Sequence, residues 1–183
     1  MYWCSSKKLL TGIACGLYVI LILPACKPAV KQKTTHFDVK GFFGRESVRL
    51  AKLNKPVCKT VYHNGLTESK KIHIDNWDTE FSLFSGSDIN RPAWRDSYYV
   101  TAEGNITIYK AKDPELVTQE ILIKQVDGKV EYMLIYNHTK NLLYTNDEEL
   151  SYFPDSLYQI NKTQSVRLLG TNKYQIKGFF NQR

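Results

Sequence analysis

The chain has 183 residues, of which 43% are hydrophobic and 23% charged, with 25 Lys plus Arg against 18 Asp plus Glu and a formal net charge of +7. This length supports one domain with a substantial hydrophobic core and is too short to argue for two. The small charge excess argues against a nucleic-acid-binding surface, although tyrosines and basic residues are interspersed along the chain.

The first 25 residues have the pattern of an export signal. Lys7 and Lys8 precede an uncharged apolar run that ends at Ala25, directly before Cys26. A membrane-spanning helix is the alternative interpretation, but the run from Leu9 to Ala25 has 17 residues, and crossing a bilayer takes about 20. The pattern therefore predicts a signal peptide, residues 1–25, that is removed from the mature protein.

The four residues Leu23-Pro24-Ala25-Cys26 resemble the lipobox of bacterial lipoproteins. The resemblance implies that Cys26 carries acyl chains such as palmitate and becomes the first residue of the mature chain. Cys15 is a competing acceptor because it also follows an alanine, but Gly12 stands where the lipobox has leucine. Several acyl chains on one cysteine hold a protein stably on a bilayer.

Removal of residues 1–25 leaves 158 residues with 23 Lys plus Arg, 18 Asp plus Glu and a formal charge of +5. Residues 26–36 are polar and basic without apolar periodicity, so they predict a short membrane tether. Residues 37–183 then form a single domain. Cys58 is the one cysteine of that domain, so no disulfide can form within it. Its strand-like context is typical of a buried thiol rather than a reactive one.

Residues 37–53 carry apolar side chains along one stripe at helical spacing, which predicts an α-helix. Asp38 is a candidate N-cap, and Asn54 with Pro56 is expected to end the helix. Glu46 falls within the apolar stripe, where an ionised carboxylate needs a partner or a raised pKa. We expect Glu46 to pair with a nearby Arg or Lys at the edge of a filled core, in which case leucine at this position leaves stability unchanged or raises it. The alternative is a polar group at the mouth of a ligand pocket.

A hairpin is expected after this helix. The segments Val57–Tyr62 and Lys70–Ile74 are strand-like, and the pair Asn64-Gly65 between them is a strong hairpin-turn signal.

The second expected helix begins after Asp75 or Asn76, either of which can cap it. Trp77, Phe81 and Phe84 recur at helical spacing on one face. Three aromatic residues at this spacing are typical of a helix that packs on a sheet, and a ligand-binding stripe is the alternative.

From Ser97 to Phe179, short strand-like segments alternate with turn residues. Short connections join antiparallel neighbours, so these segments predict a meander. Residues 141–145 and 166–169 are among the expected strands, and Asn146-Asp147 is an expected turn. The expected fold class is α+β: two N-terminal helices with an intervening hairpin, packed on a curved, about seven-stranded antiparallel meander sheet.

The sequence contains no motif for a common catalytic, phosphate-binding or metal-binding site. His73, Asp75 and Asp78 are the best candidates for metal ligands, but one histidine with two carboxylates is a weak signal. We therefore expect no metal, no cofactor and no enzymatic activity.

The run from Asp88 to Tyr98, the run from Arg167 to Asn172 and the lipobox resemble an uncharacterised lipoprotein family of Bacteroidota. The resemblance implies a bacterial envelope protein anchored in the outer membrane by its lipid, and it supplies no activity. Some of these bacteria place an acidic run after the cysteine for surface display. Residues 27–30 lack that run, which favours the periplasmic side of the membrane.

The leading functional hypothesis is a non-catalytic envelope module that binds a partner protein. The possible ligand or partner surface comprises Glu46, Trp77, Phe81 and Trp94. A lipid or lipoprotein carrier with an acyl-chain pocket under the helices is the alternative hypothesis, and an enzyme is the third.

Overall fold

The computed structural model describes residues 35–180, which belong to one compact unit. The predicted signal peptide, the lipobox and residues 26–34 of the predicted tether lie outside the described residues. Within the described range, no helix has the length and apolar character needed to cross a bilayer.

One antiparallel sheet of nine strands makes up most of this unit. The strands are β1 (Val57–His63), β2 (Leu66–Ile72), β3 (Tyr98–Glu103), β4 (Ile106–Ala111), β5 (Thr118–Val126), β6 (Lys129–Lys140), β7 (Tyr144–Phe153), β8 (Leu157–Val166) and β9 (Gly170–Phe179). Their order in the sheet is β2-β1-β9-β8-β7-β6-β5-β4-β3. Strands β3 to β9 therefore form the predicted antiparallel meander.

The predicted count of about seven strands is too low, because the hairpin β1–β2 joins the same sheet. β1 pairs with β9 from Cys58 opposite Phe179 to His63 opposite Tyr174. Without this pairing β9 would be an edge strand with unpaired backbone N–H and C=O groups. The predicted turn Asn64-Gly65 is confirmed, and both of its residues have positive φ, 46° and 96°.

Helix α2 (Val39–Leu53) confirms the first predicted helix to within two residues. The Asp38 side chain accepts a hydrogen bond from the backbone N–H of Gly41 at 2.8 Å, and Asn54 ends the helix in the left-handed conformation. Residues at the ends of the helix therefore specify where it begins and ends.

The second predicted helix is interrupted. It consists of two short helices, α3 (Trp77–Glu80) and α4 (Ser82–Gly86), which meet at Phe81. Asn76 caps α3 through a hydrogen bond from the backbone N–H of Thr79 at 2.9 Å. The backbone of Phe81 departs from helical geometry, with ψ of 13°, while its ring is fully buried. A short 3₁₀ helix, η2 (Pro92–Trp94), then leads into β3.

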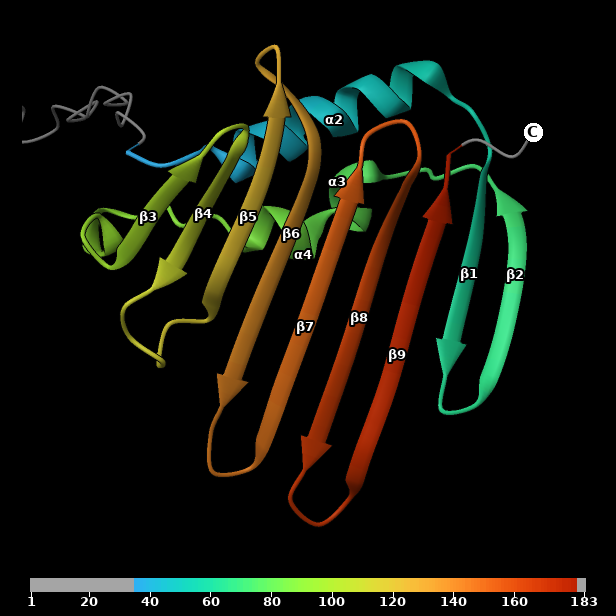
Figure 1. Cartoon of the computed structure of the whole chain (residues 1–183). Coiled ribbons are helices and arrows are strands. Elements are labelled where there is room, and N and C mark those ends of the chain that lie inside the picture. The colour runs from blue at the N-terminus through green and yellow to red at the C-terminus, as the bar shows by residue number, and fades with distance from the viewer. Residues whose placement is uncertain (1–34, 181–183) are drawn as a thin grey trace, which may run out of the picture. The chain divides into compact units, whose positions relative to one another are not determined.

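The helices lie against one face of the sheet near its upper end, and strands β6 to β9 extend well beyond them toward the lower end (Figure 1). An aromatic core fills the space between the two layers. Phe43, Phe81 and Phe84 of the helical layer pack on Tyr152 of β7 and Tyr158 of β8, and all five side chains are fully buried. The ring centroids of Phe81 lie 5.5 Å from Tyr152 and 5.6 Å from Tyr158, both edge to face.

Tyr158 packs directly on the backbone of β9 at Gly178. A Cβ at position 178 would lie 2.0 Å from Tyr158 Cε1. Glycine is therefore required at this position by the close approach of the ring.

We expect Gly178→Ala to lower the free energy of unfolding by about 1 to 3 kcal/mol, the usual cost of overpacking a core, as measured by urea denaturation. Gly44→Ala is the matched control, because outside the adjoining residues and backbone of α2 no atom lies within 4 Å of a Cβ at position 44. Alanine within a helix is favoured over glycine by about 1 kcal/mol, so this control should be stabilised. A Gly178→Ala protein as stable as the wild type would contradict the close packing of Tyr158.

Parts of two expected strands are turns. Residues 141–143 connect β6 to β7, and residues 167–169 connect β8 to β9. The expected turn at Asn146-Asp147 is wrong, because these residues pair with Thr139 and His138 inside the β6–β7 ladder. Leucines give the two turns the hydrophobicity of a strand, although their side chains lie in solvent.

Candidate functional site

Two turns at one end of the sheet carry four exposed leucines. Leu142 and Leu143 lie between β6 and β7, with exposed fractions of 86% and 71%, and Leu168 and Leu169 lie between β8 and β9, with 98% and 83%. We call these four residues the leucine tips. The turns that carry them are the lowest points of the sheet in Figure 1. Leucine is one of the residues most often buried, so four exposed leucines at one place call for an explanation.

Local interactions shape both turns. Asn141 Oδ1 accepts hydrogen bonds from the backbone N–H groups of Leu143 and Tyr144, both at 2.9 Å. This pattern is an Asx turn, which asparagine favours. Gly170 closes the other turn with φ of 89°, a conformation that residues with a Cβ rarely adopt.

Hydrogen bonds hold the two turns side by side. β7 and β8 remain paired as far as Tyr144 opposite Val166. Beyond this pair, the backbone N–H of Arg167 donates to the carbonyl oxygen of Leu143 at 2.9 Å. A shallow hollow of about 320 Å³ lies between the turns. The leucine tips are therefore one patch on a hydrogen-bonded support.

The surroundings of the leucine tips are basic. Lys140, Arg167 and Lys173 flank them, and all three are exposed. Residues 139–146 and 163–173 contain no Asp or Glu. Within residues 35–180, no ion pair joins any of these three bases to a carboxylate. Level with Lys173 in the ladder lies one carboxylate, Asp147, which is paired with His138. The patch thus combines apolar side chains with an excess of positive charge.

Another strongly exposed leucine, Leu66, lies in the β1–β2 hairpin and is 78% exposed. Leu66 does not extend as far as the leucine tips. It pairs with His63, and His63 pairs with Tyr174 of β9. Tyr174 lies four residues after Gly170, where the β8–β9 turn ends. At about 3.3 Å per residue, the offset along the strands is roughly 13 Å.

Hydrophobicity alone assigns the leucine tips to strands, and sequence reasoning therefore missed them as candidate site residues. The signal that places them in turns is the pair of adjoining turn formers, Asn141 and Gly170. Their exposure follows from pairing between strands and has no separate signature in the sequence.

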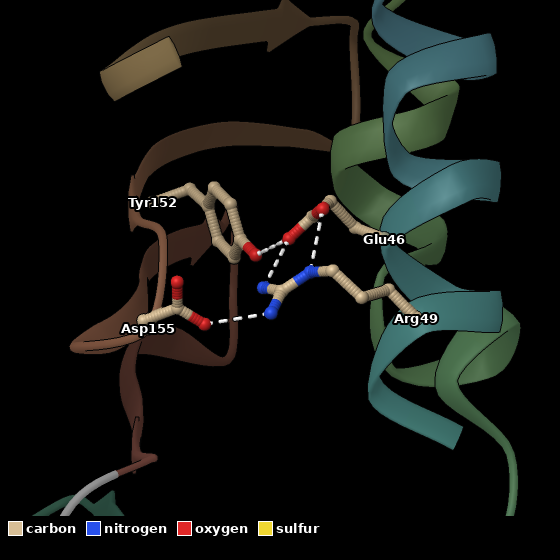
Figure 2. A network of polar contacts seen from close by, with 4 residues as sticks. All are labelled: Glu46, Arg49, Tyr152 and Asp155. Carbon is tan, nitrogen blue, oxygen red and sulfur yellow. Dashed lines mark hydrogen bonds and ion pairs between the residues drawn. The ribbon is translucent and has the colours of Figure 1, made fainter. Parts of the chain in front are cut away.

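Glu46, a predicted site residue, belongs to a polar network at the edge of the core (Figure 2). Arg49 Nε and Nη2 donate to its two carboxylate oxygens at 2.9 and 2.7 Å, and the Tyr152 hydroxyl donates to Oε2. Arg49 Nη1 donates to Asp155 at 2.7 Å. The expectation that Glu46 pairs with a nearby Arg is confirmed. Tyr152 was not foreseen because it lies 106 residues further along the chain.

The pKa shifts within this network indicate a structural role, in which the network connects α2 to the sheet. Burial, and then the hydrogen bond with Glu46, raise the pKa of Tyr152 above its ordinary value. The hydrogen bond with Glu46 is also the main reason why the pKa of Arg49 is raised. Tyr152 is therefore held protonated and Arg49 charged, and the network ties α2 to β7 and the turn that follows it.

The other predicted site residues lie in different environments. Trp77 and Phe81 are core residues, 5% and 0% exposed, and so present no surface to a partner. Trp94 is half-buried, with the guanidinium carbon of Arg91 4.3 Å from its ring centroid. A space of about 150 Å³ lies beside Trp77. Trp77 and Phe81 contact each other, with ring centroids 5.3 Å apart, and Phe81 packs on Tyr152, the hydrogen-bonding partner of Glu46. These contacts are internal to the core, so they form no exposed site.

A second polar cluster lies on the helix-facing side of the sheet, next to the end of α4. The Glu148 carboxylate, on a side chain that is 9% exposed, accepts hydrogen bonds from Lys162 Nζ at 3.0 Å, Asn146 at 2.9 Å and Asn137 at 3.3 Å. Asn137 also donates to Ser87 Oγ at 2.8 Å. Burial by itself raises the pKa of Glu148, but the hydrogen bonds from Asn146 and Lys162 outweigh burial and hold the pKa below its ordinary value.

We expect Lys162→Met to shift acid unfolding to higher pH. Because the pKa of Glu148 in the folded protein lies below its ordinary value of 4.5, ionised Glu148 stabilises the fold above about pH 4.5, and this contribution is lost as the pH falls through the folded-state pKa. Removal of the Lys162 ammonium raises that pKa, so the loss begins at higher pH. The measurement is circular dichroism during acid titration.

Lys124→Met is the matched control for this prediction. The side chains of Lys124 and Lys162 are both 32% exposed, but their partners differ, since Glu131 is 51% exposed and Glu148 9%. Exposed ion pairs contribute little to stability. The same acid midpoint for Lys162→Met and Lys124→Met would show that the Glu148 cluster does not contribute.

Among residues 35–180, no three His, Cys, Asp or Glu side chains lie close enough together to hold a metal ion. The sequence candidates His73, Asp75 and Asp78 are among the residues that form no such group. Cys58 is half-buried as a free thiol.

No protein-family model matches the chain, and no curated protein matches it. A solved structure that resembles it is the S-type phycobiliprotein lyase CPES from Guillardia theta, which is 11% identical. The alignment covers 81% of this chain and 99% of that chain, with a TM-score of 0.26. At this TM-score the similarity relates neither the folds nor the functions of the two proteins.

Proposed function

We propose that this protein is a non-catalytic binding module of the bacterial envelope that engages its partner through the leucine tips. The observation that carries the proposal is the exposure of 71% to 98% at four leucines on two adjoining turns. Single exposed hydrophobic residues are common on soluble proteins, whereas apolar residues gathered in one patch mark interaction sites.

Burial of the leucine tips supplies free energy for binding. Complete burial of one leucine side chain contributes roughly 1.5 to 3 kcal/mol, so two leucines in contact with a partner contribute about 3 to 6 kcal/mol. The turns continue paired strands of the sheet, and the Arg167 to Leu143 hydrogen bond joins them. Binding therefore orders few residues, which reduces its entropy cost.

The alternative function, an acyl-chain carrier, has less support. Five aromatic side chains fill the layer between helices and sheet. The space beside Trp77 has a volume of about 150 Å³, whereas pockets for drug-sized ligands have roughly 300 to 1,000 Å³. A larger space of about 600 Å³ at α2, α3 and α4 is lined by charged and polar residues and glycines rather than by the apolar side chains that an acyl chain needs. We therefore place the binding surface at the turns and not under the helices.

The proposal includes a lipid tether at Cys26, with the domain on the periplasmic side of the outer membrane. Its support is the resemblance of residues 23–26 to a lipobox.

We expect Cys26→Ser to leave an unprocessed precursor at the inner membrane, because the thiol is the acyl acceptor. Membrane fractionation and the mass of the intact protein measure this outcome. Cys15→Ser is the matched control and should be processed normally. Normal processing and outer-membrane recovery of Cys26→Ser would contradict the lipobox interpretation.

A photo-crosslinking amino acid at position 168 of the full chain tests the binding surface in living cells. Position 48 is the control, because Val48 is 55% exposed but lies on α2. We expect an adduct, with a protein or with a lipid, whose yield at position 168 is roughly tenfold that at position 48. Leu142→Ser together with Leu143→Ser should lower the yield at position 168, because both turns contact one partner. Equal yields at positions 168 and 48 would refute the proposal.

A further inference from the structure

We propose that the partner of the leucine tips is an anionic lipid surface, on the same bilayer that holds the Cys26 anchor. This inference rests on the proposed function and names the partner of the same surface. Three observations carry it: how the leucines project, which charges surround them, and how far they lie from the point where the tether joins the domain.

The leucines project outward from the ends of turns. Each is 71% to 98% exposed, and the hollow between the two turns is shallow. A rigid partner protein would need a separate pocket for each projecting side chain. A bilayer needs no such match, because acyl chains rearrange around any apolar group that enters the headgroup boundary. Apolar side chains of interfacial proteins enter that boundary to a depth of about 5 to 10 Å.

The charges around the leucine tips match an anionic surface. Lys140, Arg167 and Lys173 are exposed, and residues 139–146 and 163–173 contain no carboxylate side chain. Apolar side chains that insert while neighbouring cations remain at the headgroups are the usual combination for binding at a membrane surface. A purely apolar protein interface would instead leave these three cations without counter-charges.

The leucine tips lie within reach of the anchored bilayer. The backbone N–H of Phe37 donates to the Tyr109 hydroxyl at 3.2 Å, which fixes where the tether joins the domain. Tyr109 pairs with Ile121, Ile121 with Ile135, and Ile135 with Leu150, so Tyr109 and Leu150 lie at the same level of the sheet. Leu150, in β7, is seven residues from Leu143. Three strand spacings and seven residues along a strand place Leu143 about 27 Å away. Leu150 pairs with Ile160, so Leu168, one strand further and eight residues beyond Ile160, lies about 33 Å away.

His36 is already held on the domain, by Asn90 and by the carbonyl oxygen of Arg95. The remaining residues of the predicted tether, 26–35, span at most about 33 to 36 Å when fully extended. This reach exceeds the distance to Leu143 and equals that to Leu168, so both attachments can engage one bilayer at the same time. A tether alone leaves the domain free to rotate. The second attachment fixes its orientation, with the lower end of the sheet on the lipid.

Hydrogen–deuterium exchange of the full acylated chain in vesicles tests this inference. One set of vesicles is phosphatidylcholine alone, and the other contains phosphatidylcholine with phosphatidylglycerol. We expect backbone amides of residues 139–146 and 163–173 to exchange about tenfold more slowly in the anionic vesicles. Residues 66–72 of β2 should exchange equally in both. High salt should reduce the difference, because the Debye length falls from about 10 Å at 0.1 M to about 3 Å at 1 M.

Variants separate the apolar from the electrostatic contribution. Leu142→Ser with Leu168→Ser should restore fast exchange in the anionic vesicles, whereas Leu66→Ser, outside the leucine tips, should not. Replacement of Lys140, Arg167 and Lys173 by glutamine should remove the difference between the two vesicle compositions while the leucines remain.

Equal exchange in the two vesicle compositions overturns the inference. If position 168 then forms a protein adduct in cells, the binding-module proposal stands and the partner is a protein. If there is neither slowed exchange in vesicles nor an adduct in cells, both proposals fail.

Discussion

We expect Phe81→Ala to lower the free energy of unfolding by about 3 to 5 kcal/mol. The side chain is fully buried, and its ring packs against the rings of Phe43, Tyr152 and Tyr158. Removal of the ring leaves a cavity among neighbours that are held by their own packing. Domains of this size have a total stability of roughly 5 to 15 kcal/mol, so the loss is a large fraction of the whole.

Urea denaturation followed by circular dichroism measures this loss. Val48→Ala is the matched control on α2, since Val48 is 55% exposed and surface substitutions usually change stability by less than about 0.5 kcal/mol. An effect of Phe81→Ala as small as that of the control would mean that the aromatic layer is not the core of the fold.

The second large effect concerns Glu46→Leu. Here the structure reverses the expected direction of the change in stability. From the sequence, Glu46→Leu leaves stability unchanged or raises it in a filled core. In the structure the fully buried Tyr152 donates its hydroxyl to Glu46. Glu46→Leu therefore leaves a buried donor without an acceptor, which costs about 1 to 3 kcal/mol. Loss of the ion pair adds little, because the Arg49 side chain is 35% exposed and retains Asp155.

A double-mutant cycle isolates this effect. We expect Tyr152→Phe to restore much of the stability that Glu46→Leu removes, because removal of both hydrogen-bonding groups is nearly neutral. A coupling energy of about 1 kcal/mol or more between the two positions would support the bridge. Additive effects, measured by urea denaturation of the two single variants and the double variant, would contradict it.

Elements specified by nearby residues agree most closely with the sequence prediction. Asp38 and Asn54 define α2 because each bonds to a backbone group three or four residues away. Asn64-Gly65 defines the first hairpin for the same reason, since positive φ at both positions suits these two residues. Arg49 was foreseen as a basic partner of Glu46 because it lies one helical turn away.

Predictions failed where a residue's environment depends on distant parts of the chain. Hydrophobicity assigns Leu142 and Leu168 to strands, but the ladder between β7 and β8 ends at Tyr144 opposite Val166 and leaves them in solvent. The helical spacing of Trp77 and Phe81 favours a core, and both residues are buried, but a binding surface was the alternative until the sheet was known. Their burial is a property of what the helix packs against.

By itself, the sequence determined the ends of α2, the Asn64-Gly65 hairpin and the antiparallel order of β3 to β9, because capping, turn geometry and short connections act over a few residues. The tertiary structure alone decided that β1 pairs with β9, that Tyr152 completes the Glu46 network, and that the leucine tips form one exposed patch. Each of these depends on strands or residues that are distant in the chain and meet only when the whole sheet has formed.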